Sequence, residues 1–106
     1  MEDKNKYIYG KIKKIKSDLL KIGPMRPGNI NEQFKNPKEK TGSYYQLNYT
    51  HNMKTKTEYI RKSMLVPLRE ETSEYRKFKA LIEQWIELSV EASKHRIFLE
   101  KEAHKN

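Results

Sequence analysis

GSYYQLNYTHNMKTKTEYIRK, residues 42–62, alternates in side-chain character along two arms, which is typical of a β-hairpin. Tyr45, Leu47 and Tyr49 recur at every second position of the first arm, so this arm predicts a strand with one buried face. The second arm alternates lysine with threonine instead. We therefore expect the tyrosine arm to supply the inward contacts and the lysine arm to leave a basic, polar surface exposed.

The register of this hairpin depends on its turn, which we place at the three residues 51–53 because asparagine accepts a left-handed conformation. The predicted pairs are Tyr49 with Thr55, Leu47 with Thr57 and Tyr45 with Tyr59. The outward face then carries Tyr44, Gln46, Asn48, Lys54, Lys56, Glu58, Ile60 and Lys62. A turn one residue different swaps the two faces of the second strand.

Residues 1–22 predict an amphipathic helix, because their apolar side chains recur at spacings of four and three. This apolar seam consists of Ile8, Ile12, Ile15, Leu19 and Ile22. Most lysines of the segment lie off the seam. Gly23 and Pro24 are expected to end the helix, since proline cannot continue it.

Residues 67–102 predict one long helix. Pro67 suits its first position, and Glu70 and Glu71 favour the positive end of the helix dipole. The expected apolar stripe consists of Phe78, Leu81, Ile82, Trp85, Leu88 and Ala92, and the helix continues past Leu99. An unbroken helix of this length is about 54 Å long. That exceeds what a small sheet covers, so its far part must pack on the N-terminal helix, a second protomer, or both.

We predict a single α+β domain over residues 1–106: an N-terminal helix, a two- or three-stranded antiparallel sheet with a hairpin, and a long C-terminal helix. Residues 24–62 hold the connector and the sheet. Within them, Asn29–Lys35 is expected to add one short strand anchored by Ile30 and Phe34.

The net charge of +9 is concentrated in the first part of the chain. Residues 1–34 carry eight Lys/Arg against four acids, residues 35–62 carry seven against two, and residues 69–106 carry eight against eight. A low-GC genome also enriches lysine over arginine, but such a bias acts along the whole chain. A segregated basic half favours nucleic-acid contact.

Other functional classes find little in the sequence. Without cysteine the chain has no disulfide or thiolate zinc site, and a reducing cytoplasm fits best. No apolar run approaches the roughly 20 residues that span a membrane. Glu91 and His95 lie one helical turn apart, a spacing more typical of a solvated contact than of a metal site. We expect a soluble protein without enzymatic activity, metal or cofactor.

The outward hairpin face is the candidate nucleic-acid site. Amide side chains at Gln46 and Asn48 offer paired donors and acceptors to adenine in the major groove, which admits a two-stranded ribbon. Lysines and hydroxyls hold phosphates without reading sequence. The predicted backbone contacts are Tyr44, Lys54, Lys56, Arg61, Lys62, Lys38 and Lys40. The alternative is a solvated sheet face whose polar residues prevent aggregation.

The helical seams are a candidate interface for a second protomer or another protein, and they support the rival hypothesis of an antitoxin-like interaction module. The residues assigned to it are Ile8, Ile12, Ile15, Leu19, Phe78, Leu81, Trp85, Leu88, Ala92 and Leu99. RNA is a further alternative partner, because an exposed Tyr44 stacks on unpaired bases.

Four stretches resemble a family of small, uncharacterised bacterial and archaeal proteins, some of them linked to mobile elements. They are RPGNINEQF (26–34), GSYYQLNYT (42–50), TEYIRKSMLVP (57–67) and EYRKFKALIEQWIELSVE (74–91). The relatives carry a cysteine-rich loop where residues 34–45 have no cysteine. Any metal that those cysteines hold is therefore not expected here.

The order of strands, lysine-rich turn and closing helix is similar to the small three-stranded DNA-binding domain of tyrosine integrases. The similarity implies a sheet that enters the major groove. The resulting hypothesis is a small DNA-binding protein, dimeric through its helices and associated with a mobile element or phage.

Overall fold

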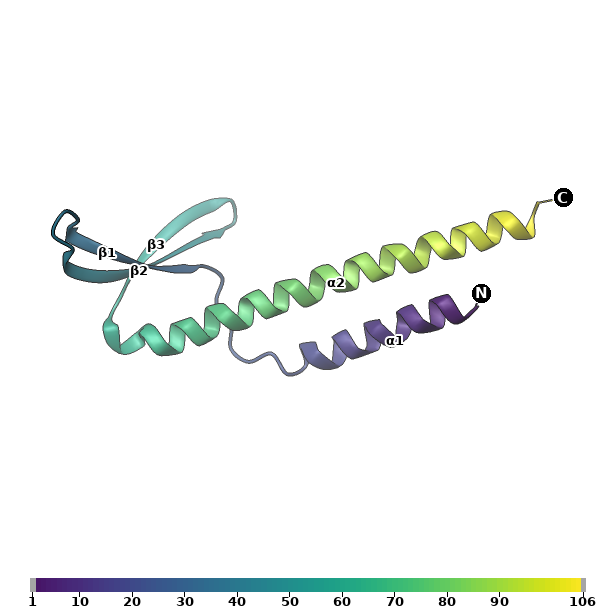
Figure 1. Ribbon diagram of the computed structural model, residues 1–106, viewed down its shortest axis with the longest axis horizontal. Helices are drawn as coiled ribbons and strands as arrows, with labels where there is room; N and C mark the ends of the chain where they lie inside the picture. Colours follow the sequence, from purple (N-terminus) through teal and green to yellow (C-terminus); the bar gives the residue numbers. More distant parts are fainter. Residues whose placement is uncertain (1, 106) are drawn as a thin grey trace. The chain divides into compact units, whose positions relative to one another are not determined.

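The computed structural model describes residues 2–105 and has the predicted α+β architecture (Figure 1). In chain order the elements are α1 (Glu2–Leu19), β1 (Asn29–Asn36), β2 (Thr41–His51), β3 (Lys54–Ile60), a 3₁₀ turn η1 (Lys62–Met64) and α2 (Leu65–Ala103). The three strands form one antiparallel sheet in the order β1-β2-β3. The fold class, the hairpin and the added first strand are thereby confirmed.

The chain divides into two compact units. Gly23–Lys77 forms the sheet unit, which contains the three strands and the beginning of α2. The two flanking parts of the chain form the two-helix unit, which contains α1 and the rest of α2 from Phe78 onward. Each unit has its own buried side chains.

The core of the sheet unit is small. Leu47 has no exposed surface, Ile60 is 4% exposed and Thr72 is 1% exposed. The side chains of Leu65 and Leu68, in the first turns of α2, are half-buried. The buried strand residues, Leu47 and Ile60, therefore share one face of the sheet, and the third buried residue, Thr72, belongs to α2.

The β2–β3 turn is shorter than predicted, and this changes the register. His51 pairs with Lys54, which leaves only Asn52 and Met53 in the turn. Both have positive φ, 51° and 63°, as a type I′ hairpin turn requires. The observed pairs are Tyr49 with Lys56, Leu47 with Glu58 and Tyr45 with Ile60, so the predicted register is wrong by one residue and the faces of β3 are exchanged.

The connector passes close to the sheet at Gly28. Its φ is 131°, and a Cβ built there would lie 2.8 Å from the carbonyl oxygen of Asn48 and 2.9 Å from Cδ1 of Leu47. Only glycine fits such a position without strain. Gly28 thus lets the chain enter β1 directly against the central strand.

The two-helix unit contains the predicted apolar seam. Ile8, Ile12 and Ala92 form a buried cluster, and Trp85 and Leu88 pack against it. Ile15 is also buried, at 6% exposed. The helical periodicity read from both segments is confirmed.

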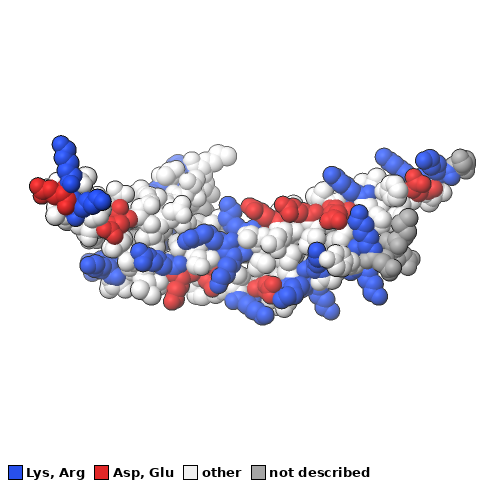
Figure 2. All heavy atoms as spheres, viewed as in Figure 1, with Lys and Arg blue, Asp and Glu red and all other residues white. Residues whose placement is uncertain are grey.

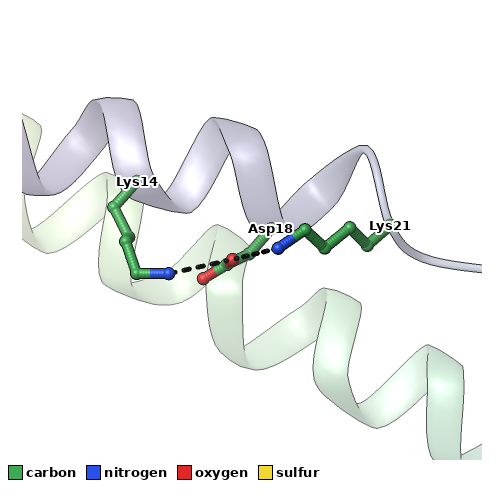
Figure 3. A network of polar contacts seen from close by, with 3 residues as sticks. All are labelled: Lys14, Asp18 and Lys21. Carbon is green, nitrogen blue, oxygen red and sulfur yellow. Dashed lines mark hydrogen bonds and ion pairs between the residues drawn. The ribbon is translucent and has the colours of Figure 1, made fainter.

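Helix α1 ends at Leu19, three residues before the predicted end at residue 22. The last turn tightens, with the amide of Lys21 donating to the carbonyl of Asp18 at 3.1 Å. Figure 3 shows the amino groups of Lys14 and Lys21 directed at the Asp18 carboxylate, at 3.3 and 3.9 Å. These contacts hold two lysines beside the end of the helix, where cations are favourable.

Helix α2 is continuous, which the sequence alone left open, and it begins two residues before Pro67. Pro67 is therefore its third residue. The first turn of a helix has no internal partner for its amides, so a proline is tolerated there without the loss of a hydrogen bond.

Replacing Gly28 with alanine is expected to destabilise the protein by more than about 1 kcal/mol, because the left-handed backbone and the close approach to β2 both oppose a Cβ. The matched control is Gly10→Ala within α1, where a Cβ meets nothing within 4 Å. That change is expected to stabilise the helix by roughly 0.5–1 kcal/mol. Urea unfolding followed by circular dichroism measures both. A Gly28→Ala protein as stable as the wild type would contradict the described path of the connector.

Candidate nucleic-acid interface

One face of the sheet is open and carries uncharged polar side chains along most of its length. Cross-strand partners point to the same side of a sheet, so the register assigns each residue to a face. The face opposite Leu47, here called the polar sheet face, consists of Asn29, Asn31, Gln33, Tyr44, Gln46, Asn48, Thr50, Thr55, Thr57 and Tyr59. It has amide, hydroxyl and phenol groups and no carboxylate.

Several of these side chains hold one another in place. The hydroxyl of Thr57 donates to Oδ1 of Asn48 at 2.7 Å, and Thr50 and Thr55 share a hydrogen bond of 3.2 Å. The rings of Tyr44 and Tyr59 are stacked, with centroids 6.3 Å apart. The amide side chain of Gln46 has no hydrogen-bond partner among the described residues. The side chains on either side of Gln46 along β2 are therefore held by neighbours on β3, whereas the Gln46 amide has no partner among the described residues.

Two of the predicted phosphate contacts lie on the other face. Lys54 and Lys56 share the side of Glu58, Ile60 and Leu47, because the two-residue turn shifts β3 by one position. Both lysines are exposed. The prediction that they flank Gln46 and Asn48 on one face is wrong, and threonines take their place. Ile60, predicted to point outward, is buried.

The Leu47 face is covered in part by the connector. The guanidinium of Arg26 lies 4.5 Å from the centroid of the Tyr49 ring and 2.8 Å from Oε1 of Glu58. The Tyr49 hydroxyl donates to the same carboxylate oxygen at 3.2 Å. The hydrogen bond from Arg26 holds the pKa of Glu58 below its ordinary value, with a smaller contribution from Tyr49. These contacts leave the polar sheet face as the open one.

Cations lie at both ends of the sheet, although Lys54 and Lys56 at one end belong to the Leu47 face. At the end with the β1–β2 turn the exposed cations are Lys35, Lys38, Lys40, Arg61 and Lys62. Lys54 and Lys56 are at the opposite end, beside the β2–β3 turn. Figure 2 shows uncharged atoms over most of the sheet and charged side chains gathered near the β1–β2 turn. The neutral, hydrogen-bonding face therefore has positive charge beside its β1–β2 end, and the lysines at the other end of the sheet lie on the opposite face.

The sequence interpretation missed Lys35 and the β1 members of this face. Alternation along NINEQFK places Asn31, Gln33 and Lys35 together, opposite the anchoring Ile30 and Phe34. A Cβ at Gly42 would lie 3.0 Å from Cβ of Lys35, which confirms that this lysine crosses to β2. The signal was present in the sequence, but the strand was interpreted only through its apolar anchors.

The predicted helical interface lies within the two-helix unit. Four of its residues are buried there, namely Ile8, Ile12, Ile15 and Ala92. The others are half-buried, namely Leu19, Phe78, Leu81, Trp85, Leu88 and Leu99. Much of this seam is thus covered by the chain itself.

The described residues contain no cluster of three His, Asp or Glu side chains suited to a metal ion. His95, expected in a solvated contact with Glu91, is only 9% exposed and its ring stacks on Phe98. Among the described helices none is both long and apolar enough to cross a membrane.

Comparison of the chain with protein-family models, with curated proteins and with solved structures gives no match. The two resemblances drawn from the sequence therefore stay predictions. Function is accordingly inferred from the geometry of the sheet.

Glu58→Gln tests which face the connector covers. Because the folded pKa of Glu58 is lowered, its ionic contribution is present above the ordinary value of 4.5 and is lost as the pH falls through the lower folded value. At neutral pH we expect the variant to be less stable by roughly 0.3–1 kcal/mol, the range of an exposed ion pair. Near about pH 3 the difference should shrink toward zero. Urea unfolding at both pH values measures it.

Glu70→Gln, at an exposed carboxylate of the same unit, is the matched control and should change stability little at either pH. A Glu58→Gln protein whose loss of stability is the same at both pH values would contradict an ion pair with Arg26.

Proposed function

We propose that the protein binds duplex DNA through the polar sheet face. The observation that carries the proposal is an open sheet face of amides and hydroxyls, without carboxylates, that has a group of Lys and Arg at its β1–β2 end. Such a surface suits base edges in its middle and phosphates at that end.

The residue types on the polar sheet face favour recognition of DNA bases by amide side chains. Asn and Gln pair with the N6 and N7 positions of adenine, and threonine contacts the methyl group of thymine. Gln46 is the first candidate, because its amide is uncommitted within the described residues. Asn31, its cross-strand partner on β1, lies beside it. Asn48 is the next candidate, although it already accepts a hydrogen bond from Thr57.

The cations supply affinity rather than specificity. Lys35, Lys38 and Lys40 lie around one turn, and their long side chains reach phosphates on either side of it. Lys54 and Lys56 point away from the reading face, so we assign them to the backbone beside the other turn. Binding on this basis falls steeply with salt, through released counterions.

A second candidate is single-stranded RNA, which the aromatic pair on the same face favours. Tyr59 is 70% exposed and stacks on Tyr44. Exposed rings on a sheet stack unpaired bases in RNA-binding modules. A cytoplasmic location and an association with a mobile element or phage remain expectations drawn from the sequence alone.

Replacing Lys35, Lys38 and Lys40 with alanine is expected to weaken binding to a random-sequence duplex. The slope of log affinity against log salt should fall by about 1 for each phosphate that the variant no longer binds. Fluorescence anisotropy of a labelled duplex at several salt concentrations measures both. Retained affinity and slope would overturn the assignment.

The matched control removes three positive charges at Lys77, Lys101 and Lys105, which lie outside the sheet, and should leave the slope nearly unchanged.

Gln46→Ala tests whether Gln46 recognises bases. The variant should keep the salt slope of the wild type. It should lose the base preference that the wild type shows when it selects from a random duplex library. Stronger competition by single-stranded RNA than by duplex DNA would favour the second candidate.

A further inference from the structure

A polar cleft lies within the sheet unit, between β1 and the beginning of α2. Its volume is about 570 Å³, and its polar lining residues are Asn29, Asn31, Arg69, Thr72, Ser73 and Arg76. None of the α2 residues belongs to the site described above. The cleft opens at the edge of the sheet, because β1 is an outer strand.

The α2 residues are spaced at three and four positions, so they share one face of the helix. Thr72 is buried; its hydroxyl donates to the carbonyl of Arg69 at 3.1 Å and accepts a hydrogen bond from Arg76 at 3.4 Å. No carboxylate of the described residues forms an ion pair with either guanidinium. Two guanidinium groups without an ion-pair partner among the described residues therefore line one cleft.

We propose that this cleft binds a phosphate group. Phosphate oxygens accept hydrogen bonds from the planar guanidinium groups of the two arginines. The hydroxyl of Ser73 and the asparagines of β1 offer further single donors. The favoured source is the nucleic-acid backbone, and this part of the inference rests on the proposed function. Asn29 and Asn31 belong both to the cleft and to the polar sheet face, so a strand lying on that face passes the cleft.

The test compares the wild type with Arg69→Gln/Arg76→Gln. The first measurement is an amide NMR titration with inorganic phosphate and with a nucleoside monophosphate. In the wild type we expect shifts at Asn31 and Ser73, which disappear in the variant. The second measurement is duplex affinity, which should fall about tenfold or more, with the salt slope reduced by about 1–2.

Lys77→Gln/Lys101→Gln removes equal charge and should leave both measurements unchanged. Shifts in the wild type without any duplex binding would overturn the proposed function and keep the cleft. Shifts with unaltered duplex affinity in the variant would assign the cleft to a free phosphate compound. An absence of shifts together with unaltered duplex affinity would overturn the inference.

A second feature, independent of the first, is an apolar stripe on α2 within the two-helix unit. Ile86, Val90 and Ile97 are 58%, 47% and 53% exposed, and Ile82 is half-buried. Part of this stripe forms a groove of about 400 Å³ that Ser89 and Ser93 also line. The stripe lies on a different side of the helix from Leu88 and Ala92, which pack in the buried cluster.

Two-fold pairing matches the two ends of the stripe, which are both isoleucine, but not its middle. A two-fold axis between Ser89 and Val90 places Ile82 opposite the partner's Ile97 and Ile86 opposite the partner's Ser93. At about 3.6 residues per turn, Glu83, Glu87 and Lys94 share one edge of the stripe. Antiparallel pairing brings the two acids of each copy toward the partner's Lys94.

We propose that a second copy of this chain covers the stripe in an antiparallel arrangement. The charge order on the edge of the stripe favours an identical partner over an unrelated one, and the isoleucines at the two ends of the stripe meet across the axis. The two small serines allow the helix backbones to approach closely. Pairing of this kind completes a bundle from two helical hairpins, which have few buried residues of their own.

Sedimentation of the full chain should show a dimer whose dissociation constant rises at least about tenfold in Ile86→Asp. Val66→Asp, at a residue of α2 that is 66% exposed and outside the stripe, is the matched control and should remain dimeric. Circular dichroism checks that both variants keep their helix content.

Charge exchange tests the orientation. Glu87→Lys should weaken the dimer, and Glu87→Lys/Lys94→Glu should restore it. A wild-type monomer at high concentration, or a dimer unaffected by Ile86→Asp, would overturn this second proposal. Failure of the double exchange to restore association would exclude the antiparallel arrangement.

Discussion

The sheet depends on two consecutive residues in the left-handed conformation. A left-handed backbone at Met53 costs roughly 1–2 kcal/mol, because its Cβ approaches the following carbonyl. The register that this turn produces buries Ile60 beside Leu47, and burying such a side chain contributes about 1.5–3 kcal/mol. The alternative register would expose Ile60 and turn Thr57 and Tyr59 toward the core. The free energy gained by burying Ile60 therefore outweighs the conformational cost of the left-handed turn.

The same turn decides what the open face presents. With β3 in the observed register, Thr55, Thr57 and Tyr59 join Gln46 on one side, and the lysines of β3 move to the other. The open face is thereby almost uncharged, and the positive charge of the sheet lies at the two ends of the strands. In the proposed DNA complex, neutral groups pair with bases without large desolvation costs, whereas cations near the strand ends meet phosphates that remain partly hydrated. The observed register separates these two tasks better than the predicted one.

The sequence predicted the elements well, because periodicity is a local property. Alternation in residues 42–62 and the seam through Ile8 and Ile12 depend only on neighbours along the chain, and both appear as expected. The turn length was not predictable in the same way. No glycine marks a two-residue turn within residues 51–53. The register is decided by the burial of Ile60, which depends on contacts between residues distant in sequence. The helical seam was correctly found, and α1 was one of the two partners expected for α2, but apolar spacing alone does not decide between α1 and a second protomer.

The proposed nucleic-acid surface of the sheet unit and the proposed dimer stripe of the two-helix unit together affect the affinity for nucleic acid. If the proposals hold, one sheet face with a few amides and one phosphate cleft makes a modest number of contacts, and a single module of this kind is expected to bind one site weakly. A dimer formed through α2 carries two sheet units, so the second contact with one nucleic acid becomes intramolecular and raises the apparent affinity without any new contact. Two-fold symmetric proteins also read two-fold symmetric sites, in which each half is short. Weak contacts within a unit are therefore compatible with tight and specific binding by the pair, provided that both units reach the same strand.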